Sequence, residues 1–387
     1  MKESTTMMRK GDNTFVPVAG LTLFAVASGY LMSLIPLSMG SFNIDTQYAG
    51  WLASAYYIGL LIGSMLIEPV IARVGHRIAF IGFLLMLAAT VILLPWMPTI
   101  EAWLPNRLIA GVAVAGIFVV VESWLLIGDN PKARAKRLSF YMTSLYGGTT
   151  LGQLAIGFIG TQGVYPFIVV LGMLLLAVLP PLLFRQGQPA SGLHQKLSLK
   201  QITRLSKPAI IGCMVSGIVM GTIYGLMPLS LKKDNFSTDQ VGVLMASIIL
   251  GGMLIQPIIS KLSVMMSKTL LLAMVSLLGV FAMGLIYISS DYIVMIVGLA
   301  LLGMSSFALY PIAITLACDK LDSSFIVAAT QVMLFSYSIG SAMGPVVAGS
   351  LLSQHGGLVN FFFIVLLVTA IYMLIASLRR KASVLVN

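Results

Sequence analysis

The chain has 387 residues, of which 58% are hydrophobic and 9% are charged, and its formal net charge is +11. Soluble globular proteins carry about 25% charged residues, so this composition excludes an ordinary soluble domain and predicts an integral membrane protein. The positive charge would also suit a nucleic-acid-binding protein. However, the basic residues flank apolar segments instead of gathering in one patch, so we expect no nucleic-acid partner.

Twelve apolar segments are long enough to cross a bilayer, which takes about 20 helical residues. The first of them is too long for the core of a signal peptide, so we expect it to stay as the first span. The segments are 16–37, 48–72, 79–97, 103–127, 138–160, 164–184, 208–231, 239–262, 268–289, 291–317, 323–352 and 357–378.

The basic residues follow the positive-inside rule. If the N-terminus is cytoplasmic and all twelve segments span, every Lys and Arg except Arg107, Lys232 and Lys233 lies on the cytoplasmic side. We therefore expect a multi-pass protein of a plasma membrane, such as a bacterial inner membrane, with both termini in the cytoplasm. We expect it to act as a monomer surrounded by the lipid bilayer.

One long polar stretch divides the apolar segments into two groups of six. It covers 185–207 and predicts a cytoplasmic linker, with room for a short amphipathic helix lying on the membrane. We therefore expect an all-α membrane protein of two pseudo-symmetric six-helix bundles, 1–184 and 208–387.

The two halves repeat each other at an offset of about 190 residues, which is typical of parallel repeats in secondary transporters. Three pairs of matching segments occur in the same order in both halves. The offset between the two members of the second pair differs from that of the other pairs by about one helical turn. The pairs are 29–38 with 221–230, 63–73 with 251–261, and Gly148, Gly152 and Gly157 with Gly340, Gly344 and Gly349.

A short basic turn follows the second segment. Arg73, Gly75 and Arg77 resemble the loop between spans 2 and 3 of the major facilitator superfamily, where the pattern is Gly-x-Leu-Ala-Asp-Arg-x-Gly-Arg-Lys. Gly75 permits the tight turn, and the arginines suit the anionic leaflet. Glu68 replaces the first Gly of the pattern and Ala72 replaces its Asp, so the charge relay that the family makes with this Asp is not carried over.

The fourth segment carries a second resemblance. Arg107 and Gly111 match the family motif in which an Arg four residues before a Gly is assigned to proton coupling. The following 119–123, Val-Val-Val-Glu-Ser, resembles a smaller, YcaD-like branch. With the twelve segments and the linker, the resemblance covers essentially the whole chain and implies the fold of that superfamily.

The fifth segment is rich in glycine where antiporters of the family carry a Gly-Pro motif. Gln153 occupies the place of that proline, and Gly344-Pro345 occurs instead in the eleventh segment. Because the proline is missing, the match to the antiporter motif is incomplete, and the inference of antiport is weaker. The small residues also allow close helix packing whatever the direction of transport.

Two ionisable residues stand inside the fourth segment, where a charge in hydrocarbon is unfavourable by at least about 2.5 kcal/mol. Arg107 either extends to the interface, tunes the potential of a cavity or binds an anionic group. Glu122 either forms a structural hydrogen bond to a neighbouring helix or carries protons, since its neutral and ionised forms favour different conformations. We expect Glu122 and Arg107 to serve proton coupling.

Further residues are predicted to shape the substrate pathway. Pro36 and Pro228 stand at matching places in spans 1 and 7, where they allow the helices to bend. The polar and aromatic residues expected to line the cavity are Tyr30, Tyr56, Tyr57, Tyr141, Gln153, Tyr224, Tyr310 and Tyr337.

We therefore expect a secondary active transporter that moves a small organic molecule by alternating access. Proton-coupled efflux of amphiphilic compounds, drugs or secreted metabolites such as siderophores is the leading reading. Proton-coupled uptake and a non-transporting membrane sensor stay open. The spans contain no paired carboxylates, His cluster, HExxH or nucleophile elbow, so we expect neither an enzyme nor a cofactor or metal.

Overall fold

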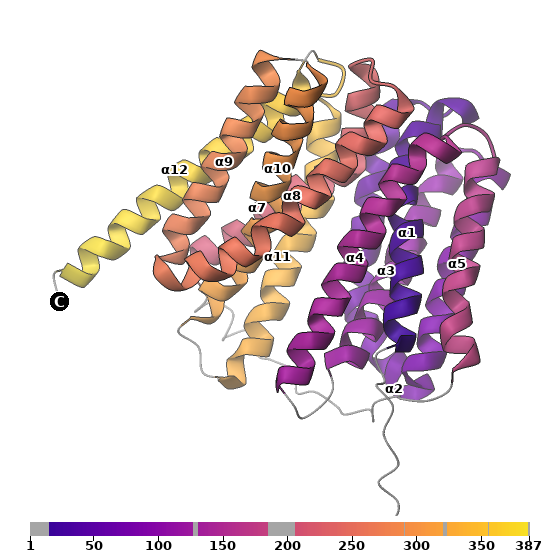
Figure 1. The fold of residues 1–387 in the computed structure, drawn as a ribbon, viewed down its shortest axis with the longest axis horizontal. Helices are drawn as coiled ribbons and strands as arrows, with labels where there is room; N and C mark the ends of the chain where they lie inside the picture. Colours follow the sequence, from indigo (N-terminus) through magenta and orange to yellow (C-terminus); the bar gives the residue numbers. More distant parts are fainter. Residues whose placement is uncertain are drawn as a thin grey trace, which may run out of the picture.

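The computed structural model describes residues 15–126, 131–184, 206–289, 291–319, 323–354 and 356–385, and within these residues it is helical without strands. The helices form two bundles that lie side by side, coloured indigo to magenta and red to yellow in Figure 1. The expected linker lies mostly outside the described residues, and so does the amphipathic helix predicted in it.

The helix bounds agree with the predicted segments to within a few residues at most ends. The first bundle contains α1 (Phe15–Ser38), the 3-10 turns η1 (Met39–Phe42) and η2 (Thr46–Tyr48), α2 (Ala49–Trp96), α3 (Ile100–Leu126), α4 (Pro131–Ile159) and α5 (Tyr165–Leu183). The second contains α7 (Lys207–Lys233), α8 (Thr238–Met265), α9 (Lys268–Ile288), α10 (Tyr292–Cys318), α11 (Ser323–Gly349) and α12 (Gly357–Leu385).

The second and third predicted spans form the single element α2, interrupted at Gly75. Gly75 has φ 80° and ψ 161°, a conformation that costs glycine little but is unfavourable for residues with a Cβ atom. The chain therefore reverses at Gly75 with no loop between the two spans. We call the membrane face at Gly75, where α1 also begins, the basic side, and the opposite face the far side.

Eleven segments in the described residues are long and apolar enough to cross a membrane, and α4 is not among them. The predicted fifth span is nevertheless a helix, and its polar and small residues pack against α1 and α8. Its lower hydropathy follows from this central place, because a helix covered by protein needs fewer apolar side chains than one facing lipid.

Matching glycines bring matching helices together in the two bundles. A Cβ atom on Gly59 would collide with the backbone carbonyl of Leu108, and one on Gly111 with that of Tyr56, so α2 and α3 touch through their backbones. The pairs Gly251 with Ala300 and Gly303 with Ile248 join α8 to α10 in the same way.

This packing fixes the register of the repeat. Gly251 is the structural counterpart of Gly59, at the same offset that relates Gly29 to Gly221. The sequence match of Gly63 with Gly251 is therefore wrong by one turn, and so is the pairing of Glu68 with Gln256.

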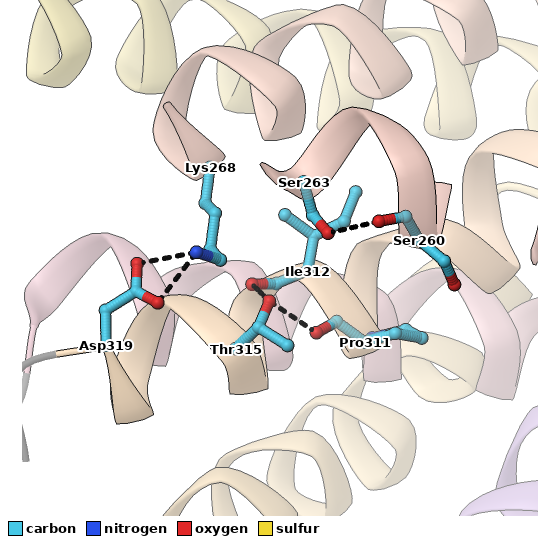
Figure 2. A network of polar contacts seen from close by, with 7 residues as sticks. All are labelled: Ser260, Ser263, Lys268, Pro311, Ile312, Thr315 and Asp319. Atoms are coloured by element: carbon cyan, nitrogen blue, oxygen red, sulfur yellow. Dashed lines mark hydrogen bonds and ion pairs between the residues drawn. The ribbon is translucent and has the colours of Figure 1, made fainter. Parts of the chain in front are cut away.

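An ion pair lies near the basic side of the second bundle, as Figure 2 shows. Lys268 Nζ lies 2.7 and 2.8 Å from the two carboxylate oxygens of Asp319, which ties the start of α9 to the end of α10. Both side chains are partly exposed, so the pair contributes little to the free energy of unfolding.

Candidate functional site

A cavity lies among α1, α2, α3 and α7, in the half of the first bundle nearer the far side. It holds about 610 Å³ of space free of protein atoms, part of it open to solvent. Most of its wall is apolar, and its polar or charged groups come from a few residues. The lining residues are Ser28, Leu31, Met32, Ile35, Pro36, Met39, Ala49, Leu52, Ala53, Tyr56, Tyr57, Leu87, Arg107, Val114, Tyr224 and Gly225.

Arg107 is the charged residue of this cavity. Its neighbours Leu108 and Gly111 pack against the backbone of α2. This close contact between α2 and α3 fixes the position from which the Arg107 side chain extends. The side chain is only 8% exposed, and its Cζ atom lies 4.6 Å from the centre of the Tyr56 ring. Its Nε atom is buried and has no hydrogen-bond acceptor in the part of the chain that the structure describes.

Glu122 lies on the same helix near the basic side, 15 residues and therefore about 22 Å from Arg107. Its side chain is exposed, and its carboxylate accepts a hydrogen bond of 2.6 Å from the hydroxyl of Tyr141 on α4. No basic side chain among the described residues pairs with it.

One aromatic contact, Tyr146 with Phe307, joins the two bundles, and further aromatic contacts lie within the second bundle. The rings of Tyr146 on α4 and Phe307 on α10 lie 5.5 Å apart, centre to centre, and Tyr224 on α7 lies 6.5 Å from Phe307. Tyr310 and Tyr337 form another contact at 5.1 Å. Tyr146 is not among the predicted cavity residues, although it directly precedes the glycine pair of the fifth span.

The predicted cavity residues thus fall into three groups. Tyr56, Tyr57 and Tyr224 line the cavity. Tyr141 meets Glu122, and Tyr310 and Tyr337 contact each other within the second bundle.

Gln153 and Tyr30 instead hold α1 against α4 and its following turn. The Gln153 amide is fully buried, accepting from Ser33 Oγ at 2.7 Å and donating to the Gly29 carbonyl at 2.8 Å. The Tyr30 hydroxyl donates to the Gly160 carbonyl. Both side chains have the geometry of interhelical packing, because their polar groups are occupied by protein.

Pro36 lines the cavity, and Pro228 lies one helical turn beyond the lining residue Tyr224. Proline lacks the N–H that would bond the carbonyl four residues earlier. For Pro36 and Pro228 these carbonyls belong to Met32 and Tyr224, and both of those residues line the cavity.

The basic turn joins two helices of the first bundle. Arg77 donates from Nη2 to the Leu182 carbonyl at 2.9 Å and from Nε to the Pro181 carbonyl, which ties α2 to the end of α5. Arg73 is exposed, as expected for a residue at a lipid headgroup. The side chain of Glu68 lies outside the described part of the structure.

Contacts between the bundles gather in the far half of the molecule. Gly50 at the start of α2 packs against Pro345 of α11, Gly225 against Ala53, and Gly157 at the end of α4 against Asp239 at the start of α8. From there α4 and α8 diverge toward the basic side (Figure 1). The described residues hold no group of three His, Cys, Asp or Glu suited to a metal ion.

Comparison with known proteins identifies this architecture. The family profile of the Major Facilitator Superfamily matches residues 18–345 and 209–385. The chain belongs to the major facilitator superfamily. It is a membrane transporter, and the resemblance inferred from the span 2–3 turn and the fourth span is confirmed.

Two bacterial relatives match nearly the whole chain, and one of them is named YcaD. An MFS-type transporter of Enterobacter sp. (strain 638) is 34% identical over 370 residues, and YcaD of Salmonella dublin is 33% identical over 371. In both cases the match covers 94% of each chain. Both relatives are uncharacterised transporters, so they establish the family without giving a substrate.

Solved structures share the fold at low sequence identity. The nucleoside transporter NupG matches with a TM-score of 0.75 at 15% identity, covering 96% of this chain and 99% of NupG. A D-xylose–proton symporter matches with a TM-score of 0.68 at 15% identity, covering 93% and 96%. These structures confirm the fold of two six-helix bundles, and the family match confirms the expectation of a transporter instead of an enzyme.

Proposed function

We propose that this transporter exports amphiphilic organic molecules in exchange for protons by alternating access. The two bundles would rock about the central aromatic contacts, closing the far side in one state and the basic side in the other. The described contacts between bundles suit the first of these states.

The observation that carries the coupling is the environment of Glu122. Its carboxylate is exposed and hydrogen-bonded to Tyr141, and no described basic group neutralises it. A carboxyl group so placed can take up a proton in one state and release it in the other. Protonation removes its charge beside Tyr141 of α4, a helix that packs against α8 of the opposite bundle, and so changes the relative free energy of the two arrangements.

The walls support an amphiphilic substrate. The cavity combines aliphatic side chains with the rings of Tyr56, Tyr57 and Tyr224. Aromatic and aliphatic surface binds organic groups without demanding one shape, and the few polar groups fix orientation. Drugs and secreted metabolites such as siderophores belong to this substrate class.

Transport in proteoliposomes under an imposed pH gradient tests the proposal. Labelled neutral, anionic and cationic amphiphiles would be offered to the wild-type chain, to Glu122→Gln and to the control Glu101→Gln. Glu101 is exposed at the start of the same helix, so its substitution removes an acidic charge outside the pathway. We expect Glu122→Gln to abolish flux driven by the gradient and to retain substrate exchange, and Glu101→Gln to behave as wild type.

The same measurement decides the alternatives. Flux in the same direction as the protons would favour uptake by symport, the activity that the name of the D-xylose–proton symporter gives to that neighbour. Binding without any flux would favour a sensor. Gradient-driven flux that survives Glu122→Gln would remove Glu122 from the coupling mechanism.

A further inference from the structure

We infer that Arg107 binds the anionic group of the transported molecule, which is therefore an organic anion with an aromatic or flat apolar body. This inference rests on the proposed transport function for its biological meaning, while the binding site itself stands on the geometry of the cavity.

The first argument is the unmet hydrogen-bonding capacity of the guanidinium. Arginine has five N–H donors and no acceptor, and it stays charged at physiological pH. More than nine-tenths of the Arg107 side chain is buried, and its Nε donor has no acceptor among the described residues. A buried charge in a spanning helix is normally paired, so an acceptor is expected to come from outside the described chain.

The second argument is that the neighbouring residues stabilise the cation without neutralising it. The face of the Tyr56 ring lies under the guanidinium, which gives a cation–π interaction and leaves the N–H groups free to donate. Arginine presents two parallel N–H groups that match a carboxylate, sulfonate or phosphate. By contrast, the Lys268 ammonium group of the second bundle is paired with a carboxylate, that of Asp319.

The third argument is the space around the charge. The cavity continues from Arg107 over Tyr57 and Tyr224 and along the aliphatic side chains of α1 and α2. An inorganic anion would meet the guanidinium but leave this apolar surface uncovered. A flat apolar body attached to the anionic group would cover it, so an organic anion fits the site better than a small ion.

The repeat supports a dedicated role for this residue. At the offset fixed by the glycine contacts, the counterpart of Arg107 in the second bundle is Leu299, which is buried. The matching pair of helices in the second bundle, α8 and α10, therefore packs with a leucine at this position. Packing of α2 on α3 alone does not explain why the residue in the first bundle is an arginine.

The test compares carboxylates with their own amides on the purified full-length chain in detergent. The probes are benzoate, 4-phenylbenzoate, 2-naphthoate and indole-3-acetate, each beside its primary amide, and sodium chloride and sodium nitrate as inorganic anions. Affinity is measured by isothermal titration calorimetry and by the rise in unfolding temperature, since a ligand of the folded state stabilises it. We expect at least one carboxylate to bind about tenfold more tightly than its amide, the ratio typical of one hydrogen bond to a charged group.

Three variants complete the experiment. Arg107→Gln should remove the preference for the carboxylate, Arg107→Lys should retain part of it, and Lys233→Gln, which removes an exposed cation at the end of α7, should keep it whole. Equal binding of every carboxylate and its amide to the wild-type chain would overturn the inference, whether or not the variants fold. Chloride or nitrate competing as tightly as the aromatic carboxylates would also overturn it, because the site would then bind a small ion.

Failure of this inference can be told apart from failure of the proposed function. Carboxylate binding that requires Arg107, without flux in proteoliposomes, would preserve the site and refute transport coupled to protons. Glu122-dependent flux of neutral amides that is insensitive to Arg107→Gln would preserve the transport proposal and refute the anion site.

Discussion

At the scale of single residues, two charges on one helix occupy very different surroundings. Arg107 is buried against a tyrosine ring near the closed side, whereas Glu122 is exposed and meets a tyrosine hydroxyl nearer the basic side. The sequence revealed both because charges are rare in spanning helices. It did not reveal that each has a tyrosine as its described partner, since that depends on how α2 and α4 pack against α3.

The hydrogen bond between Tyr141 and Glu122 leads to a prediction on pH dependence. The hydroxyl donates to the carboxylate, so it stabilises the ionised form relative to the neutral one. In Tyr141→Phe this stabilisation is lost, and the proton is released only at higher pH. We expect the pH profile of substrate flux to move upward by about one unit, equivalent to about 1.4 kcal/mol.

Flux measured between pH 5 and 9 in proteoliposomes checks this shift. Tyr146→Phe is the matched control, because it removes a hydroxyl from the same helix without touching Glu122. An unchanged profile in Tyr141→Phe would mean that the hydrogen bond does not affect the titration that limits transport.

At the scale of helices, contact between backbones explains why particular glycines occur. A Cβ atom at Gly111 would overlap the carbonyl of Tyr56, which belongs to a rigid helix, whereas one at Gly82 in α2 would meet no atom within 4 Å. We expect Gly111→Ala to lower the free energy of unfolding by about 1–3 kcal/mol, the usual range for overpacking. Gly82→Ala should be neutral or slightly stabilising, because alanine favours the helix.

Unfolding temperatures of the two variants in the same detergent test this difference. Equal unfolding temperatures for Gly111→Ala and Gly82→Ala would show that α2 and α3 can separate freely at this contact. Gly303→Ala, which introduces the same overlap with Ile248 in the second bundle, should reproduce the loss if the repeat is structural.

The helices themselves were largely predictable, because apolar length alone sets the spans. The errors have physical causes. The tight turn expected at Gly75 is present and is no such error; it takes only one residue, so spans 2 and 3 follow each other directly in α2. The repeat was misaligned by one turn because Pro69 and Pro257 match in sequence, whereas the backbone contact of Gly59 and Gly251 decides the packing. Gln153 was read as a cavity residue because burial of both ends of its amide cannot be seen from the sequence.

At the scale of the whole molecule, two bundles with matching internal contacts meet mainly in the far half. Within each bundle the helices are locked by backbone contacts, while the surface between bundles is built from aromatic rings and short contacts at helix ends. Such an arrangement allows the bundles to move as rigid bodies. The cavity with Arg107 lies beside the closed half, so opening of the far side would release whatever Arg107 holds.

A disulfide across the far side tests whether this half must open during transport. A Cβ atom at Gly157 would lie 3.3 Å from Cβ of Asp239, close to the separation of about 3.5–4.5 Å found in disulfides. Gly157→Cys with Asp239→Cys, built after Cys213 and Cys318 are replaced by Ser, should therefore crosslink on oxidation. We expect oxidation to reduce flux to the background of empty liposomes and a reductant to restore it, whereas each single cysteine stays active. Full flux through the crosslinked protein would show that the end of α4 and the start of α8 stay together throughout the cycle, and rocking of the bundles about the central contacts would then be excluded.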